Sequence, residues 1–328
     1  MPRNLQMSES EGGVTPASNA AGSSADTQDH NQAAKVVAVV ITFNPPNLLP
    51  LLSELERQVA GIVVVDNGST PASLPSLRQA CERHTLVEIG ENIGIAAAQN
   101  LGIEQARGMG AEYVLLSDHD SVPAPNMVSK LLSALEADEM VGAAGPLPSE
   151  DREGADQLVY VARKWAPKRA HPEELAQPTL DVAFLVASGC LIRMRCLDNV
   201  GDMNTALFID HVDLEWGLRA RRSGWRLVCV PAATLHHSLG DEVVMLPGRT
   251  QPVHVHSPMR NYYILRNTLF LVREGGELMP SRWRLRYAWW ALKYLAFNGF
   301  LVDRLPQRRT ELRAAMRDAR RGRKGRRG

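Results

Sequence analysis

Short runs of apolar, β-branched residues alternate with stretches of helical spacing along the first part of the chain, and this alternation limits the possible folds most strongly. The first run, Val36–Thr42, reads VVAVVIT and predicts a strand that is buried on both faces. Strands separated by helices at short intervals favour βαβ units and a parallel sheet. Further strands are predicted at Ile62–Val65, Leu86–Ile89 and Tyr113–Leu116, and helices at Leu48–Gln58, Leu74–Arg83 and Ile95–Arg107.

The second half of the chain has a less regular pattern. Ser149–Gln177 is polar and predicts a loop with some helix, and Phe184–Ile192 predicts a pair of strands or a bend around Ser188 and Gly189. A helix is expected at Asp213–Arg222, followed by a strand at Trp225–Val230.

The bulk composition excludes some classes of protein. The 328 residues, 45% of them hydrophobic, suffice for one large core or two modest ones. Lys and Arg total 37 against 36 for Asp and Glu, so no strong field attracts nucleic acid. The four cysteines form no CxxC pair and no zinc-type spacing, which indicates reduced, buried thiols and a cytosolic protein.

The two ends of the chain differ in character. Residues 1–34 are polar and carry no apolar signal-peptide core, so we expect a disordered tail. No run of 18 apolar residues predicts a spanning helix. The basic stretch Arg304–Arg327 follows Trp283, Trp289 and Trp290. This composition fits an interfacial segment on an anionic membrane, and it equally fits a solvated helix with a charged end.

Polar residues follow the predicted strands where each strand ends: Asn44, Asp66 and Asp118. Open α/β sheets bind ligands in the crevice at these carboxyl ends. The chain has neither GxGxxG after the first strand nor GxxxxGK[ST] anywhere, which argues against a dinucleotide dehydrogenase and against a P-loop NTPase.

Asp118 and Asp120 form an i, i+2 pair of carboxylates directly after a buried strand. Two such carboxylates on a turn can bind one hard cation, which in turn can neutralise a diphosphate leaving group. The alternative is structural, because Asp pairs are common in turns.

A second acidic cluster, Asp210 to Glu215, lies at a predicted helix start. Asp213 fits the helix N-terminus, where acids favour the dipole. Asp210 precedes the helix and can serve as a general base. His237, one of two adjacent histidines after the last strand, is a candidate metal ligand or a merely exposed side chain.

Nucleotide recognition has its own candidates. Asp66 can accept a hydrogen bond from N3–H of a pyrimidine, with Thr42 and Asn44 near the base or ribose. Gly94, two residues after Asn92 and just before a helix, permits close approach of an anion. Turn formers at strand ends are also expected when no ligand binds.

Taken in order, these segments resemble the GT-A glycosyltransferases of family 2. The resemblance runs from about Val36 to about Asn267 and rests on VITFN, VVVDNGS, ENIGIAAAQNLGIEQA, LLSDHDS, FIDHVDLEWGLRARRSGWRL and LHHSLGD. The last three are most similar to the rhamnosyltransferase branch. The resemblance implies a GT-A (Rossmann-like) α/β fold with a mostly parallel sheet flanked by helices. It divides the chain into a tail at 1–34, a transferase domain at 35–272 and a helical, basic C-terminal extension at 273–328.

The resemblance also implies roles for individual residues. Asp210 would be the base, although His211 occupies the place of the family's second acid, so His211 and Asp213 stay open as alternatives. Mg²⁺ or Mn²⁺ would be held by Asp118, Asp120 and His237, with Asp120 the more direct ligand. The nucleotide sugar would be bound by Thr42, Asn44, Asp66, Asn67, Asn92, Gly94, Gln99, Asp118, Ser188 and Gly189.

The implied activity is inverting transfer of a sugar, L-rhamnose from dTDP-L-rhamnose, to a hydroxyl of a glycan or lipid-linked acceptor in cell-surface polysaccharide biosynthesis. A family 2 transferase that uses UDP-galactofuranose or a UDP-hexose is one alternative, and a non-catalytic nucleotide-binding scaffold is another. The expected location is cytoplasmic, peripheral on the inner face of the membrane. The acceptor and the oligomeric state are left open.

Overall fold

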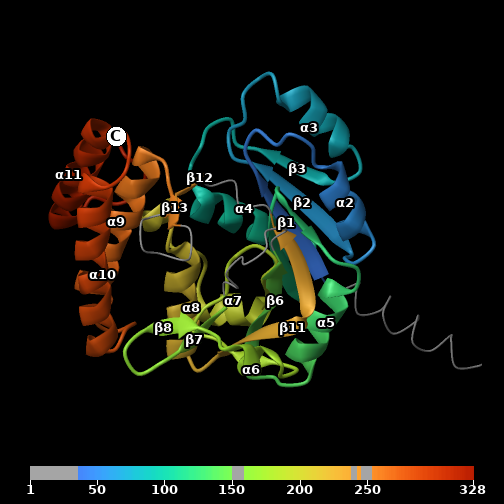
Figure 1. The fold of residues 1–328 in the computed structure, drawn as a ribbon. Helices are drawn as coiled ribbons and strands as arrows, with labels where there is room; N and C mark the ends of the chain where they lie inside the picture. The colour runs from blue at the N-terminus through green and yellow to red at the C-terminus, as the bar shows by residue number, and fades with distance from the viewer. Residues whose placement is uncertain (1–35, 150–158, 238–241, 245–252) are drawn as a thin grey trace, which may run out of the picture.

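A central mixed sheet organises the protein. The computed structural model describes residues 36–149, 159–237, 242–244 and 253–328, so the predicted tail at 1–34 lies outside the described residues. The 9-stranded sheet has the order β3-β2-β1-β4-β10-β6-β11-β5, and β9 pairs with β11 (Figure 1). The pairs β3-β2, β2-β1, β1-β4 and β6-β11 are parallel, whereas β10, β5 and β9 run antiparallel to their neighbours. Its strands are β1 (Val36–Thr42), β2 (Gly61–Asp66), β3 (Thr85–Glu88), β4 (Tyr113–Asp118), β5 (Ser121–Pro123), β6 (Val141–Ser149), β9 (Leu180–Asp181), β10 (Leu191–Arg193) and β11 (Arg226–His237).

Helices cover both faces of this sheet because the central strands are apolar on both sides. All seven residues of β1 are buried. Val37, Val39 and Ile41 belong to one core cluster, while Val36 and Val40 belong to the other, as the alternation of a strand requires. One face packs against α4 (Ile95–Gly108), α7 (Met194–Val200) and α8 (Val212–Arg222), and the other against α2 (Leu49–Glu56), α3 (Leu74–Ala80) and α5 (Met127–Glu136).

The predicted elements of the first half are confirmed, with small shifts at their ends. The strand Val36–Thr42 has the predicted bounds, and β4 runs two residues further than predicted, so that Asp118 is its last residue. The elements β5, α5 and β6 were not predicted. Helix α5 carries its apolar residues on one face, and the five that are buried lie at Met127, Val128, Leu131, Leu132 and Leu135.

The second half required corrections. Phe184–Ile192 does not form a pair of strands: Phe184 makes one isolated bridge with Tyr160, and only β10 is a strand. The bend at Ser188 and Gly189 is confirmed, since the chain turns there with φ +79° at the glycine. The segment predicted as a loop with some helix also contains a hairpin. The remaining elements before the C-terminal helices are β7 (Tyr160–Ala162), β8 (Pro167–Arg169), α6 (Pro172–Leu175), η1 (Thr205–Leu207), β12 (Glu242–Val244) and β13 (Val253–Val255).

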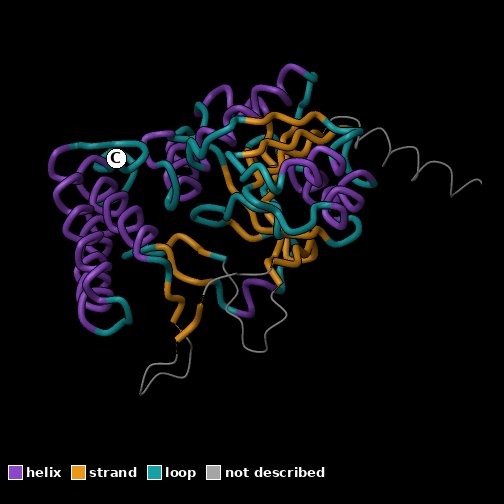
Figure 2. The backbone as a smooth tube through the Cα atoms, turned by 90° about the horizontal axis from the view of Figure 1, so that it is seen from above, coloured by secondary structure: helices purple, strands orange, loops and turns teal. Residues whose placement is uncertain are grey.

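Three C-terminal helices lie side by side next to the sheet domain, as Figures 1 and 2 show from two directions. They are α9 (Pro258–Glu274), α10 (Ser281–Phe300) and α11 (Leu305–Arg321). The grouping of Trp283 with Trp289 and Trp290 as surface residues was wrong, because Trp283 is buried and donates from Nε1 to the Arg163 carbonyl at 2.8 Å. Within the described residues, no helix has the length and apolar character needed to cross a bilayer.

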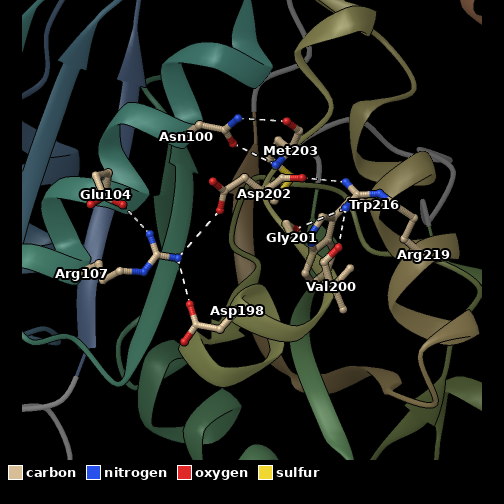
Figure 3. Close-up of polar contacts among 10 residues, drawn as sticks. All are labelled: Asn100, Glu104, Arg107, Asp198, Val200, Gly201, Asp202, Met203, Trp216 and Arg219. Carbon is tan, nitrogen blue, oxygen red and sulfur yellow. Dashed lines mark hydrogen bonds and ion pairs between the residues drawn. The ribbon is translucent and has the colours of Figure 1, made fainter.

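The loop that leads from α7 to η1 is fixed from two sides (Figure 3). On α4, Asn100 exchanges hydrogen bonds of 2.9 Å with the backbone of Met203. On α8, Arg219 donates to the carbonyl of Val200 at 2.8 Å and to that of Asp202 at 2.7 Å. These contacts fix the backbone of the loop that precedes η1.

Candidate active site

A cleft of about 660 Å³ opens at the carboxyl ends of β1 and β4 and extends to the N-terminus of α8. This is the position where open α/β sheets bind ligands. The structure brings most of the residues named in the sequence analysis to the wall of this one cleft. They are Thr42, Asn67, Asn92, Gly94, Gln99, Asp118, Asp120, Ser188, Asp210, His211 and Asp213.

Asn44, Asp66 and Gly189 are not among the lining residues. The buried carboxylate of Asp66 accepts hydrogen bonds from the backbone N–H and the hydroxyl of Ser69, and so it holds its own turn together. Asn44 caps the same turn, since its Oδ1 accepts from Thr70 N at 2.8 Å. Gly189 packs against Pro146 and Leu235. The side chain of His237 lies outside the described residues.

A chain of serine hydroxyls positions the two acids at the end of β4. The N–H of Asp118 donates to Ser188 Oγ at 3.2 Å, and that hydroxyl donates to Ser121 Oγ at 2.9 Å. Ser121 Oγ in turn donates to the Asp120 carboxylate at 3.4 Å. Asp118 is half-buried and Asp120 is exposed. The turn Asp118–Ser121 is thereby tied to the bend at Ser188.

Two carboxylates of this kind fit a hard cation. Among the described residues, no group of three or more His, Cys, Asp or Glu side chains has the arrangement of a metal site. Sites for Mg²⁺ at nucleotides usually contain only one or two carboxylates, and substrate phosphates and water supply the other ligands. Asp118 and Asp120, side by side on an open cleft, satisfy that requirement.

Two buried polar atoms on the cleft wall have no hydrogen-bond partner within the described part of the chain. They are Oγ1 of Thr42, a residue that is 1% exposed, and Oε1 of Gln99, a residue that is 2% exposed. A buried polar atom without a partner costs about 1–3 kcal/mol, so such atoms call for an explanation. Hydrogen bonds to a polar ligand in the cleft would offset this cost.

Side-chain amides join the two loops beside these atoms. Asn67 Oδ1 accepts from Ile93 N at 2.9 Å, and Asn92 Oδ1 accepts from Gly94 N at 3.0 Å. Gly94 has φ +92°, and a Cβ placed there would lie 2.6 Å from the ring and 2.7 Å from the carbonyl oxygen of Phe208. The next residue, Ile95, donates its N–H to that same carbonyl at 2.8 Å. Only glycine therefore fits at this junction of the cleft.

The segment before α8 has an unusual backbone. Phe208, Asp210 and His211 have φ values of +67°, +64° and +63°. Non-glycine residues in such regions cost about 1–3 kcal/mol each and are found mainly at functional sites. The Asp210 carboxylate, with a side chain 10% exposed, accepts from Arg260 Nε at 3.1 Å.

The two other base candidates are held differently. Burial lowers the pKa of His211 to about 4, so its ring is neutral at pH 7. Burial, and then the negative charges of Asp210 and Asp118, raise the pKa of Asp213 to about 6. Oδ1 of Asp213 accepts from the N–H of the next residue, Leu214, at 2.8 Å.

Phe43, Phe208 and Arg260 also line the cleft, although they were not predicted as site residues. Phe43 is 45% exposed and lies between two residues that had been singled out, so its position offered a signal. Arg260 lies on α9, about 50 residues after Asp210, in a stretch where no recognisable motif drew attention to it.

Comparison with known proteins agrees with this geometry. Residues 37–201 match the family described as Glycosyl transferase family 2. The dTDP-rhamnosyl transferase RfbF of Shigella flexneri is 32% identical over 245 residues, which cover 74% of this chain and 81% of RfbF. The N-acetylglucosaminyl-diphospho-decaprenol L-rhamnosyltransferase of Mycobacterium tuberculosis is 27% identical over 310 residues, covering 84% of this chain and 95% of that protein. The galactofuranosyltransferase GlfT1 of Mycolicibacterium smegmatis is 26% identical over 272 residues, covering 78% and 89%.

Solved structures share the fold at low sequence identity. Residues 1–349 of S. aureus TarS in complex with UDP-GlcNAc superpose with a TM-score of 0.55 at 15% identity, covering 87% of this chain and 80% of TarS 1–349. GalNAc-T7 with UDP, GalNAc and Mn²⁺ gives a TM-score of 0.54 at 15% identity, covering 80% of this chain and 57% of that one.

Proposed function

The chain belongs to glycosyl transferase family 2, and on that premise we propose that it transfers L-rhamnose from dTDP-L-rhamnose to a hydroxyl of a glycan or lipid-linked glycan. The observation that carries the proposal is the single cleft that collects the carboxylate pair after β4, the polar wall of β1 and α4, and the acidic segment before α8. The two rhamnosyltransferase relatives favour rhamnose as the sugar.

Residues on the two sides of the cleft would bind the two substrates. Thr42 and Gln99, with their buried polar atoms, would bind polar groups of the nucleotide, and Asn67 and Asn92 would border it. The acidic segment before α8 would bind the acceptor hydroxyl and take its proton as the oxygen attacks the anomeric carbon. A single displacement from the face opposite the nucleotide inverts the configuration, and no nucleophilic carboxylate is required.

Asp118 and Asp120 would hold Mg²⁺ or Mn²⁺, and His237 stays a predicted third ligand. When bound, the cation would supply charge neutralisation for the departing diphosphate. Asp66, which holds the turn after β2, keeps a predicted role at the pyrimidine through its position beside Asn67 and Thr42.

The donor is tested by direct competition. With purified full-length protein, Mn²⁺ and an acceptor mixture, we expect sugar transfer and slow donor hydrolysis from dTDP-L-rhamnose, detected by mass spectrometry. UDP-galactofuranose and UDP-hexoses serve as the comparison, because GlfT1 is a galactofuranosyltransferase. If only a UDP-sugar is turned over, dTDP-L-rhamnose is rejected as the donor, and the transferase activity is still supported.

We also propose a peripheral position on an anionic membrane surface, on the cytoplasmic face. Along α10 the exposed residues Leu285, Trp289 and Leu292 follow helical spacing, at 66%, 53% and 54% exposure. Exposed Arg286 and Lys293 stand beside them. An apolar helix face flanked by cations fits the interface of a bilayer with anionic lipids.

Flotation with vesicles tests this surface. The full-length protein is expected to float with vesicles containing phosphatidylglycerol and not with phosphatidylcholine alone. The double variant Leu285→Ser/Trp289→Ser is expected to bind at least about tenfold more weakly, because burying each side chain contributes about 1.5–3 kcal/mol. Trp165→Ser is the matched control, since Trp165 is equally exposed at 53% but lies outside α10. Equal recovery of all three proteins would reject the membrane surface.

A further inference from the structure

Helix α9 holds the backbone of the acidic segment through one buried amide. Asn267 is 0% exposed, and its Nδ2 donates to the carbonyls of Leu207, Ile209 and Asp210 at 2.9, 2.8 and 3.0 Å. This contact fixes the strained run of positive φ values that brings the His211 ring to the cleft. The backbone of the acidic segment is therefore held in place by α9.

The next residue of α9 decides which nitrogen of His211 carries the proton. Thr268, also 0% exposed, donates its only hydroxyl hydrogen to the Ile264 carbonyl at 2.7 Å. The same oxygen lies 2.7 Å from His211 Nε2. A hydroxyl has one hydrogen to give, so here it must accept, and Nε2 must be the protonated nitrogen. Because the ring is neutral at pH 7, its basic lone pair is on Nδ1.

The two carboxylates of the same segment already have polar partners. Asp210 is engaged by the Arg260 guanidinium, and a cation at 3.1 Å weakens a carboxylate as a base. Asp213 Oδ1 accepts the N–H of Leu214 at 2.8 Å in the first turn of α8. Neither engagement applies to Nδ1 of His211, for which no hydrogen-bond partner is found in the described part of the chain.

We propose that His211, held as the Nε2–H tautomer by Thr268, is the general base of the transfer. The inference rests on the proposed function. As the acceptor oxygen forms its bond to the anomeric carbon, its proton passes to Nδ1. The bond from the anomeric carbon to the diphosphate breaks, and its electron pair leaves on the phosphate oxygen. The imidazolium that results keeps its Nε2–H on Thr268.

The tautomer can be observed without any substrate. In ¹⁵N-histidine-labelled full-length protein, two-bond ¹H–¹⁵N correlation spectra distinguish Nε2–H from Nδ1–H rings. The His211 signal is assigned among the nine histidines by its loss in His211→Asn. We expect the Nε2–H pattern in the wild type and in Thr268→Ser, and a shifted or mixed pattern in Thr268→Val. An Nδ1–H ring in the wild type would overturn the proposal.

Kinetics test the base itself. His211→Asn is expected to lower kcat for transfer by about 10²–10⁴-fold, the usual contribution of a general base, with the Kd of the nucleotide sugar unchanged. Asparagine tolerates the left-handed backbone at this position, so the fold is expected to survive. Thr268→Val is expected to lower kcat about 10–100-fold with unchanged KM for the donor, as loss of an orienting partner does, and Thr268→Ser to stay near wild type.

The outcomes separate the inference from the function it rests on. If the wild type neither binds nor turns over any nucleotide sugar, the proposed function fails. If the wild type transfers sugar but His211→Asn keeps its kcat while Asp210→Asn or Asp213→Asn loses it, the base is a carboxylate and this inference alone is wrong.

Discussion

Replacing Asp120 by alanine is expected to lower kcat for sugar transfer by at least about 10³-fold, which corresponds to about 4 kcal/mol of transition-state stabilisation. Asp120 is exposed on the cleft wall, and its carboxylate accepts a 3.4 Å hydrogen bond from Ser121. Substitution of an exposed side chain usually changes stability by about 0.5 kcal/mol or less. The loss therefore reports on the reaction. It is measured as transfer rate against Mn²⁺ concentration, alongside calorimetric binding of the donor with and without Mn²⁺.

The control for Asp120→Ala is Asp198→Ala, which removes another exposed aspartate. Asp198 pairs with Arg107 at 3.0 Å (Figure 3), and neither residue lines the cleft. Exposed pairs of this kind contribute about 0–1 kcal/mol, so activity should stay near wild type. A nucleotide-binding scaffold without catalysis predicts no turnover in any of the proteins. Full turnover in Asp120→Ala would remove the carboxylate pair from the mechanism.

Gly94→Ala is expected to lower the free energy of unfolding by about 2–6 kcal/mol and to weaken nucleotide-sugar binding. Gly94 has φ +92° and ψ +155°, a conformation nearly restricted to glycine. It costs an alanine about 1–3 kcal/mol, and forcing a methyl group into a packed site costs a further 1–3 kcal/mol. The clash is with the ring and backbone oxygen of Phe208, so the acidic segment must move away from α4. Urea unfolding and calorimetric titration with the nucleotide sugar measure the two effects.

Gly90→Ala is the control that separates the backbone cost from the steric cost. Gly90 has a similar φ of +82°, but a Cβ there would meet nothing within 4 Å. The Gly90→Ala variant should therefore be destabilised only by the backbone cost, about 1–2 kcal/mol, and should bind the nucleotide sugar as the wild type does. Equal losses in the two variants would mean that the contact between Gly94 and Phe208 contributes nothing.

The GT-A fold and the family were predictable from the sequence because both are encoded locally. The strand β1 is a continuous β-branched run, and the acids after β4 follow directly from a buried strand. Eleven of the named positions line one cleft because the carboxyl ends of neighbouring parallel strands meet at one sheet edge. The residues' roles in binding and catalysis stay predictions.

What the sequence did not reveal depends on contacts between distant segments. Arg260, Asn267 and Thr268 reach the acidic segment from a helix about 50–60 residues later in the chain, and helical spacing in α9 says nothing about that partner. Trp283 illustrates the same limit. The composition grouped Trp283 with two exposed tryptophans, but in the structure its side chain is buried in the same cluster as Leu214.

All four cysteines are buried and free, and burial raises the pKa of each thiol. This agrees with the reduced thiols expected from their spacing. It also means that they contribute as small apolar side chains and that their thiolates are scarce at neutral pH.

The buried amide of Asn267 has a consequence for engineering acceptor preference. Three backbone carbonyls ahead of α8 take their geometry from this one side chain. A chimera whose grafted C-terminal helices lack an asparagine at this position would leave all three carbonyls without their donor, so the graft must keep Asn267.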